Sequence, residues 1–274
     1  MQAQLAIKEQ VVKKVVKSGN GGAVWVPKNW LGQEVVVILP QKPKLELKEK
    51  IVHLLEPYLK DIVAVGIYGS FARNEQTKDS DVDVLVITKD KKLVLNFKDE
   101  KIEVISFTID NLKKAIKKYP TTYYFTAREA VPLVNASVLE ELKEVKVEKQ
   151  DFVNYLEETK DHLKSNMELL ELDKLDGNYL SSYSVVYSLI LRLRGIFIIS
   201  CILKNKPFSN KEFKKWATNR GISNEEFEDS HKVYRLIRDE QSIKNLKIKI
   251  EVVEKLLNSL EKELKSLETK IHGK

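Results

Sequence analysis

Residues 69–86 read GSFARNEQTKDSDVDVLV and connect two apolar runs of the chain. A Gly-Ser pair closes one apolar run, and after ten intervening residues Asp81 and Asp83 open a second one. Successive side chains of a β-strand alternate between its two faces, so both aspartates point to one side while the valine after each points to the core. Two carboxylates are therefore expected to meet at one end of a strand.

The residue types around this strand end predict a site for phosphate chemistry. Two close carboxylates repel each other unless a hard cation with oxygen ligands neutralises them, and Mg²⁺, or Mn²⁺ in its place, is the natural candidate. Backbone N–H groups of the Gly-Ser turn and the Ser70 hydroxyl can approach phosphate oxygens, and a helix beginning at Phe71 would direct its positive dipole end at them. These parts favour phosphoryl or nucleotidyl transfer.

The same stretch resembles the polymerase β-like nucleotidyltransferase superfamily, in particular its minimal members. The family pattern is a Gly-Ser turn, Ala-Arg on the following helix, and Ser-Asp-x-Asp followed by apolar residues. This resemblance implies that Gly69 and Ser70 bind the triphosphate of an NTP, with ATP as the first candidate. It implies that Asp81 and Asp83 are catalytic residues that bind metal ions, and that Arg73 binds phosphates or stabilises the local structure.

The family also places a third carboxylate, usually Asp, on a neighbouring strand. Glu103 in the segment KIEVISFT is the candidate for this catalytic and metal-binding position. Glu is longer than Asp, and this departure could reposition a metal ion or leave the site inactive. Asp99 and Glu100 are nearby alternatives, and Glu103 could instead be an exposed strand residue paired with Lys101.

The rest of the chain predicts an α+β protein of three parts. These are an N-terminal β-hairpin arm at 1–43, a nucleotidyltransferase domain with a small mixed sheet at 44–118, and a C-terminal helical bundle at 119–274. Within the second part, helical spacing predicts an amphipathic helix from Leu45 to Leu59 and another from Asp110 to Lys118. A chain of 274 residues with 43% apolar content can bury a large core.

Residues 11–39 of the arm predict short strands (VVKKVVK, AVWVP and EVVVIL) and a glycine-rich turn, and residues 15–39 read VVKSGNGGAVWVPKNWLGQEVVVIL. So few strands cannot bury both faces, so the arm should pair with a second copy or dock on the rest of the chain. It resembles AbrB-like DNA-binding arms and a short archaeal transposon-associated domain. That resemblance implies a homodimer and nucleic-acid contacts through Lys13, Lys14, Lys17 and Lys28. A purely structural dimerisation arm is the alternative.

The helical part contains an apolar run, Val185 to Leu203, that approaches membrane-spanning length. Arg192 and Arg194 lie at its middle, where each would cost roughly 2.5 to 3.5 kcal/mol on membrane insertion. A buried helix is therefore expected rather than a membrane span. If buried, both arginines need partners, and structural ion pairs are favoured over contacts with an acceptor substrate.

Further patterns organise the helical part. Ser209 with Glu212 and Ser223 with Glu226 predict two helix starts. The last helix shows the heptad spacing of a helix that packs along a partner, either within the chain or across a dimer. Its apolar positions are Ile250, Val253, Leu257, Leu260, Leu264, Leu267 and Ile271. The helical part resembles the substrate domains of kanamycin-type transferases and HEPN partners of minimal ones. No His follows Arg238 at the spacing of the RNase-type HEPN signature, so RNase activity is not expected.

Charge and cysteine content suggest the compartment and the partners. The net charge is +7, and seven lysines against two glutamates up to Lys44 place +5 of it in the arm and the linker. This favours a polyanionic partner, with a solvated lysine-rich surface as the equal alternative. The single Cys201 can form no internal disulfide, and the N-terminus does not resemble a secretory signal, so we expect a cytoplasmic protein.

Two functions follow from these patterns. The first is Mg²⁺-dependent transfer of a nucleoside monophosphate from an NTP, with release of pyrophosphate. Its acceptor is a protein hydroxyl, an RNA end or a small molecule. The alternative is a non-enzymatic DNA-binding regulator whose transferase domain only binds nucleotide, and this interpretation gains if the third carboxylate is missing from the site.

Overall fold

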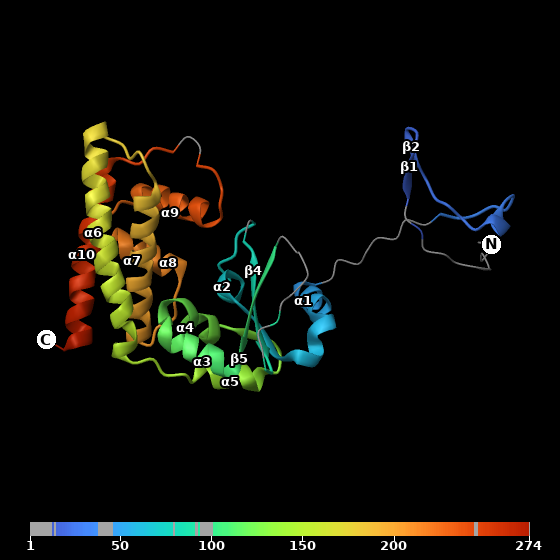
Figure 1. Ribbon diagram of the computed structural model, residues 1–274, viewed down its shortest axis with the longest axis horizontal. Helices are drawn as coiled ribbons and strands as arrows, with labels where there is room; N and C mark the ends of the chain where they lie inside the picture. The colour runs from blue at the N-terminus through green and yellow to red at the C-terminus, as the bar shows by residue number, and fades with distance from the viewer. Residues whose placement is uncertain are drawn as a thin grey trace. The chain divides into compact units, whose positions relative to one another are not determined.

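The computed structural model of the chain divides into two compact units, Met1–Leu45 and Glu46–Lys274 (Figure 1). The structure describes residues 13, 15–37, 46–78, 80–90, 93, 101–243 and 246–273. Lys14, Asp99 and Glu100, which the sequence analysis named as candidates, lie outside the described residues.

The first unit contains one β-hairpin. Strand β1 (Val16–Ser18) pairs antiparallel with β2 (Gly21–Ala23). Gly19 makes the turn with φ +57°, a backbone conformation that favours glycine, as the glycine-rich sequence predicts. A single 3₁₀ turn, η1 (Lys28–Trp30), follows.

The prediction of further strands in the arm is wrong for the residues that the structure describes. Residues 24–27 and 33–37 form no strand, although the valines at 35, 36 and 37 have the composition of one. These three side chains are exposed. A strand needs a neighbour for its backbone hydrogen bonds, and within a single chain this segment pairs with no described strand.

The second unit is built on a four-stranded mixed sheet, which confirms the predicted α+β class. Its strands are β3 (Ile62–Tyr68), β4 (Val82–Thr88), β5 (Ile102–Thr108) and β6 (Val131–Val134), in the order β5-β4-β3-β6. The β3 strand is antiparallel to both β4 and β6, whereas β4 and β5 are parallel. The sheet therefore takes its fourth strand from beyond residue 118, where the sequence analysis ended the transferase segment.

Helices cover both faces of this sheet. On one face α1 (Leu47–Leu55) packs Ile51 and Leu55 against the valines of β4. On the other, Leu85 and Ile87 of β4 belong to the core that contains α3 (Ile109–Lys118), α4 (Pro120–Arg128) and α5 (Ala136–Lys143). The first helix ends earlier than the predicted Leu59, because a 3₁₀ segment, η2 (Glu56–Asp61), begins where Pro57 enters the chain.

The remainder of the second unit is helical. A 3₁₀ turn, η3 (Lys149–Phe152), leads into α6 (Val153–Asp176) and α7 (Ser184–Leu203). These are followed by α8 (Asn210–Thr218), α9 (Asn224–Arg238) and α10 (Ile250–His272). The α10 helix packs along α6 and α7 with all of its predicted heptad residues buried, so this seam is filled within one chain (Figure 1).

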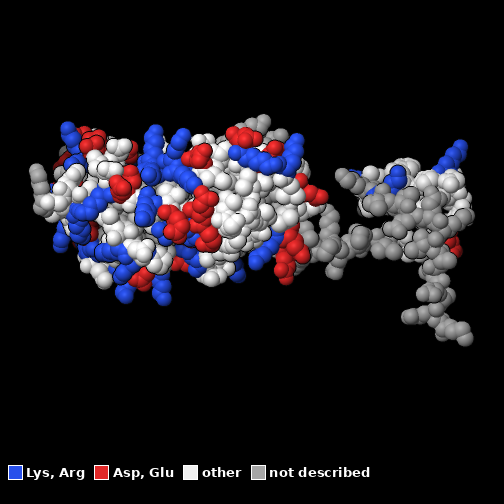
Figure 2. All heavy atoms as spheres, turned by 90° about the horizontal axis from the view of Figure 1, so that it is seen from below, with Lys and Arg blue, Asp and Glu red and all other residues white. Residues whose placement is uncertain are grey.

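The α7 helix is the core helix of this part. By length and composition it could cross a membrane, but it is largely buried and contacts α6, α9 and α10. Arg192 lies over the ring of Tyr155 and forms an ion pair with Glu158 at 3.4 Å, which confirms the structural pairing predicted for this arginine. On the face drawn in Figure 2, basic side chains of the second unit lie among acidic ones rather than in one continuous basic surface.

Candidate active site

Three neighbouring strands bring most of the predicted site residues to one edge of the sheet. The β3 strand ends at Tyr68, and Gly69 and Ser70 follow at once in a short helix, α2 (Gly69–Ala72). Near the start of β4, Asp83 lies opposite Tyr68 in the antiparallel pair and beside Glu103 in the parallel pair with β5. The register thus places Asp83 between the Gly-Ser turn and Glu103.

Gly69 allows the turn to approach the aspartate closely. Its φ is +73°, which only glycine adopts readily. A Cβ atom at this position would lie 2.8 Å from Cγ of Asp83 and closer still to its Oδ2 atom. Any other residue would therefore displace the carboxylate, so the glycine is required by this contact and by the backbone conformation together.

The electrostatics of Asp83 reflect a crowded acidic site. The pKa of Asp83 is raised to about 6, chiefly by burial and then by the charge of Glu103, while Arg73 and Arg238 oppose the shift. Burial and the same two carboxylates also raise the pKa of Tyr68. The negative charges of Asp83 and Glu103 therefore destabilise each other, and a cation between them would relieve this repulsion.

A complete metal site is not preformed among the described residues. They contain no group of three or more His, Cys, Asp or Glu side chains placed to hold a metal ion. Asp81 directly precedes β4 and is exposed, so the structure brings Asp83 and Glu103 together without gathering all three predicted ligands. Mg²⁺ commonly binds one or two carboxylates together with substrate phosphates, so the acidic pair fits a metal site that the nucleotide completes.

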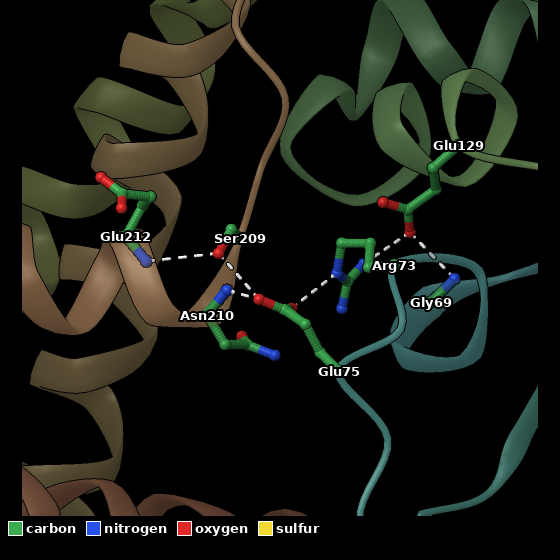
Figure 3. Close-up of polar contacts among 7 residues, drawn as sticks. All are labelled: Gly69, Arg73, Glu75, Glu129, Ser209, Asn210 and Glu212. Carbon is green, nitrogen blue, oxygen red and sulfur yellow. Dashed lines mark hydrogen bonds and ion pairs between the residues drawn. The ribbon is translucent and has the colours of Figure 1, made fainter.

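Glu129 is a site residue that the sequence analysis missed. It follows α4, and its Oε1 atom accepts hydrogen bonds from the backbone N–H of Gly69 at 2.9 Å and from Nη1 of Arg73 at 2.6 Å (Figure 3). Burial raises the pKa of Glu129 although Arg73 opposes the shift. The Gly69 amide thus already binds a carboxylate of the protein, which leaves Ser70 as the more accessible phosphate ligand of the turn.

Arg73 is engaged in a network that links the turn to the helical part. Its Nε atom donates to Glu75 at 3.0 Å, and Glu75 accepts hydrogen bonds from Oγ of Ser209 at 2.7 Å and from the backbone N–H of Asn210 at 3.2 Å (Figure 3). Of the two roles left open for Arg73, this geometry supports the stabilisation of local structure. The α2 helix has four residues, so the predicted dipole at the turn is weak.

The charges of two arginines of the helical part also act on carboxylates of the site. Arg194 of α7 lies over the ring of Phe208 at 4.7 Å, and the positive charge of Arg238 at the end of α9 lowers the pKa of Asp83. The predicted ion pair of Arg194 is wrong for the described part of the chain, in which no carboxylate pairs with it. In the sequence, Arg194 stands out only as the second arginine of an apolar helix. The residues that surround it are determined by tertiary contacts, which the sequence pattern does not give.

The comparison with protein families identifies the class of the sheet segment. Residues 49–135, about one third of the chain, match the family model described as Polymerase beta, Nucleotidyltransferase. The matched range contains all four strands of the sheet together with Gly69, Asp83 and Glu129. This segment is therefore a nucleotidyltransferase domain of the polymerase β type, and the match supports nucleotidyl transfer in general as its activity.

Similarity over the whole chain is weaker. A solved structure described as a nucleotidyltransferase-like protein from Exiguobacterium sibiricum 255-15 is 14% identical, with a TM-score of 0.39. The match covers 83% of this chain and 78% of that one, but a TM-score of this size supports no argument about the site. No curated protein matches the chain. The HEPN-like character of the helical part and the AbrB-like character of the arm stay predictions.

Proposed function

We propose that the second unit transfers a nucleoside monophosphate from an NTP to an acceptor hydroxyl. The observation that supports this most strongly is the register of β4 with its two neighbours, which sets Asp83 between Glu103 and the Gly69-Ser70 turn. In the reaction the acceptor oxygen forms a bond to the α-phosphorus, the bond from that phosphorus to the bridging oxygen breaks, and pyrophosphate leaves.

The residues of the site have separate roles in this proposal. Asp83 and Glu103 would hold Mg²⁺ or Mn²⁺, with Asp81 as a further ligand from the residue before β4. When bound, the divalent ion would supply charge neutralisation for the phosphates and a lower pKa for the acceptor hydroxyl. Ser70 would donate a hydrogen bond to a phosphate oxygen, and Arg73 would keep Glu129 and the turn in place.

The acceptor and the nucleotide are open within this proposal. A protein hydroxyl, an RNA 3′ end and a small-molecule hydroxyl all provide the required oxygen, and ATP is the first nucleotide to test. The experiment is to incubate the full chain with each α-labelled NTP and Mg²⁺ or Mn²⁺, together with total RNA or total protein. Label that becomes attached to one class of acceptor identifies it, and labelling with one NTP identifies the donor.

Asp83→Asn provides the decisive variant. It removes one negative charge of the predicted metal site with little change in volume, so labelling should be nearly abolished while the fold is kept. Asp90→Asn is the matched control, because Asp90 is exposed after the far end of the same strand and should not affect transfer. Unchanged labelling by a folded Asp83→Asn protein would contradict the assignment.

The alternative of a DNA-binding regulator is favoured by one observation. The described residues do not form a three-ligand metal site. A sensor that binds nucleotide without catalysis does not need one. In that case the full chain would bind NTP without transfer. The arm would then carry the function, with exposed Lys13, Lys17 and Lys28 on nucleic acid and exposed Trp25 and Leu31 available to a second copy.

A further inference from the structure

Two guanidinium groups share one aromatic ring at the contact between the sheet domain and the helical part. The Cζ atom of Arg194, from α7, lies 4.7 Å from the centre of the Phe208 ring, and that of Arg73 lies 5.2 Å from it. Both cations are therefore held close to the same ring. A cation–π contact contributes only about 0.5 to 2 kcal/mol, so it does not by itself account for placing two cations here.

The two arginines differ in their anionic partners. Arg73 has two, Glu75 at 3.0 Å and Glu129 at 2.6 Å. Arg194 has none among the residues that the structure describes, and its side chain is half-buried. A half-buried cation loses part of its hydration, and no ion pair compensates this loss at Arg194, so its position carries a cost in free energy.

Neighbouring charges make this location more positive. Burial lowers the pKa of Arg194, and the positive charges of Arg73 and Arg238 lower it further, while Tyr234 and Tyr155 act in the opposite direction. The charges of Arg194 and Arg238 also act on His231, which lies on α9 between Phe227 and Tyr234.

The pKa of His231 is lowered to about 4, chiefly by burial and then by the charge of Arg235, with smaller contributions from Arg194 and Arg238. Glu228 is the residue that opposes this shift. The positive charge of Arg238 contributes to the shifts at both Arg194 and His231, although burial is the largest cause of each.

This positive location adjoins the acidic edge of the sheet. Arg238 and Arg73 both act on the charge of Asp83, and Arg73 reaches the Gly-Ser turn through Glu129. A bound polyphosphate would complement both charges. Its metal-bound oxygens would face the carboxylates, and its other oxygens would face the arginines. The planar guanidinium group matches the geometry of phosphate oxygens.

We propose that Arg194, assisted by Arg238, binds the β- and γ-phosphates of the nucleotide, so that the helical part supplies one wall of the nucleotide site. This inference rests on the function proposed above and assigns Arg194 to the donor rather than to the acceptor. The triphosphate provides the anion that Arg194 lacks in the free protein.

A structural role for Arg194 predicts different behaviour of the same variant. If Arg194 mainly joins α7 to Phe208, then Arg194→Met should lower the stability of the protein. If Arg194 is an unpaired cation kept for a ligand, Arg194→Met removes a half-buried charge, retains the apolar stem, and should leave the melting temperature equal or raise it. The melting temperature and the triphosphate affinity are therefore measured on the same samples.

The binding test uses inorganic triphosphate with the full chain, in EDTA so that no metal contributes. Isothermal titration should give about 10- to 100-fold weaker binding for Arg194→Met, the scale of a lost charged hydrogen bond. Arg194→Lys should lie between this variant and the wild type. Arg192→Met is the matched control, because Arg192 lies two residues away on α7 over its own aromatic ring but has Glu158 as a partner.

The outcomes separate this inference from the proposed function. The role of Arg194 is contradicted if Arg194→Met binds triphosphate as tightly as the wild type does. It is also contradicted if Arg194→Met has a lower melting temperature and Arg192→Met loses as much triphosphate affinity as Arg194→Met. If labelling by the wild type still occurs in that case, the proposed function stands alone. If triphosphate binding depends on Arg194 while no NTP labels any acceptor, the phosphate site stands and the proposed transfer fails.

Discussion

Asp83→Asn changes the charge of the candidate site while almost preserving the volume of the side chain, so its effect on stability measures the electrostatics directly. Burial and Glu103 raise the pKa of Asp83 from its ordinary value of 3.8 to about 6. At about 1.4 kcal/mol per pH unit this difference corresponds to about 3 kcal/mol. Because Asp83 is partly exposed and solvent screens the interaction, we expect about 1 to 3 kcal/mol.

The sign follows from the direction of the shift. A carboxyl whose pKa is raised in the folded protein stabilises the fold below its unfolded pKa, and this contribution is lost as the pH rises from about 4 to about 6. Above pH 6 the ionised Asp83 destabilises the folded protein, and a neutral asparagine does not. Asp83→Asn should therefore be more stable than the wild type at pH 8 without metal.

The assay is thermal or urea unfolding at pH 8 in EDTA, then at pH 4.5, with Asp90→Asn as the exposed control. Each kcal/mol shifts the melting temperature of a protein of this size by about 2 to 4 °C. The gain of Asp83→Asn should shrink at pH 4.5, and added Mg²⁺ should stabilise the wild type more than the variant. A variant that is less stable than the wild type at pH 8 would refute the reasoning, because Asp83 would then have a stabilising partner.

Four further variants test neighbouring parts of the site and the arm. Ser70→Ala should weaken NTP binding by roughly 1 to 2 kcal/mol in isothermal titration, the scale of a hydrogen bond to a charged group, and no change would mean that Ser70 does not contact phosphate. Glu129→Ala should cost about 2 to 4 kcal/mol of stability in urea unfolding, because it removes the acceptor shared by the Gly69 amide and Arg73 and leaves Arg73 with one carboxylate partner; a cost near zero would show that neither hydrogen bond is needed. His231→Phe should flatten the rise of stability from pH 4 to pH 6.5, since the lowered pKa of His231 makes the wild type less stable as the pH falls through this window. Deletion of residues 1–40 should abolish duplex DNA binding, and for about four lysine–phosphate contacts the full chain should show a log–log salt slope near −3.6; a salt-independent affinity would contradict these contacts.

The features that the sequence predicted correctly are those that depend on neighbouring residues. Apolar runs bounded by charged loops located β3, β4 and β5, and the alternation along β4 placed Asp83 on the site edge. The two Ser-x-x-Glu patterns begin α8 and α9, where Ser209 and Ser223 accept hydrogen bonds from backbone N–H groups three residues later. These contacts form within one turn of chain, so a local pattern is sufficient to specify them.

The fourth strand could not be recognised from its own residues. The β6 strand has four residues with Pro132 among them, which weakens any strand prediction. Proline is tolerated here because β6 is the edge of the sheet and pairs only with β3, where Pro132 lies opposite Gly66. That pairing spans more than sixty residues of sequence, and only the folded sheet reveals it.

The same limit applies to Glu129 and Arg194. Neither belongs to a motif, and each obtains its role from groups far along the chain, Gly69 and Arg73 for the first and Phe208 for the second. In the arm, composition alone does not predict the strands. Valine-rich segments become strands only where a partner strand supplies hydrogen bonds.

A hydrogen-bond network at the Gly-Ser turn joins the sheet domain to the helical part, beside the apolar core that the two parts share. Glu129 joins Gly69 to Arg73, and Glu75 joins Arg73 to the start of α8. A fragment that ended at residue 118 would lose β6 and Glu129 together, so the Gly69 amide and Arg73 would lack their shared carboxylate. A fragment that ended at residue 135 would keep Glu129 but expose Glu75, whose partners Ser209 and Asn210 lie in the helical part. The geometry of the turn therefore depends on residues from both parts, and the candidate site is not complete in the sheet domain alone.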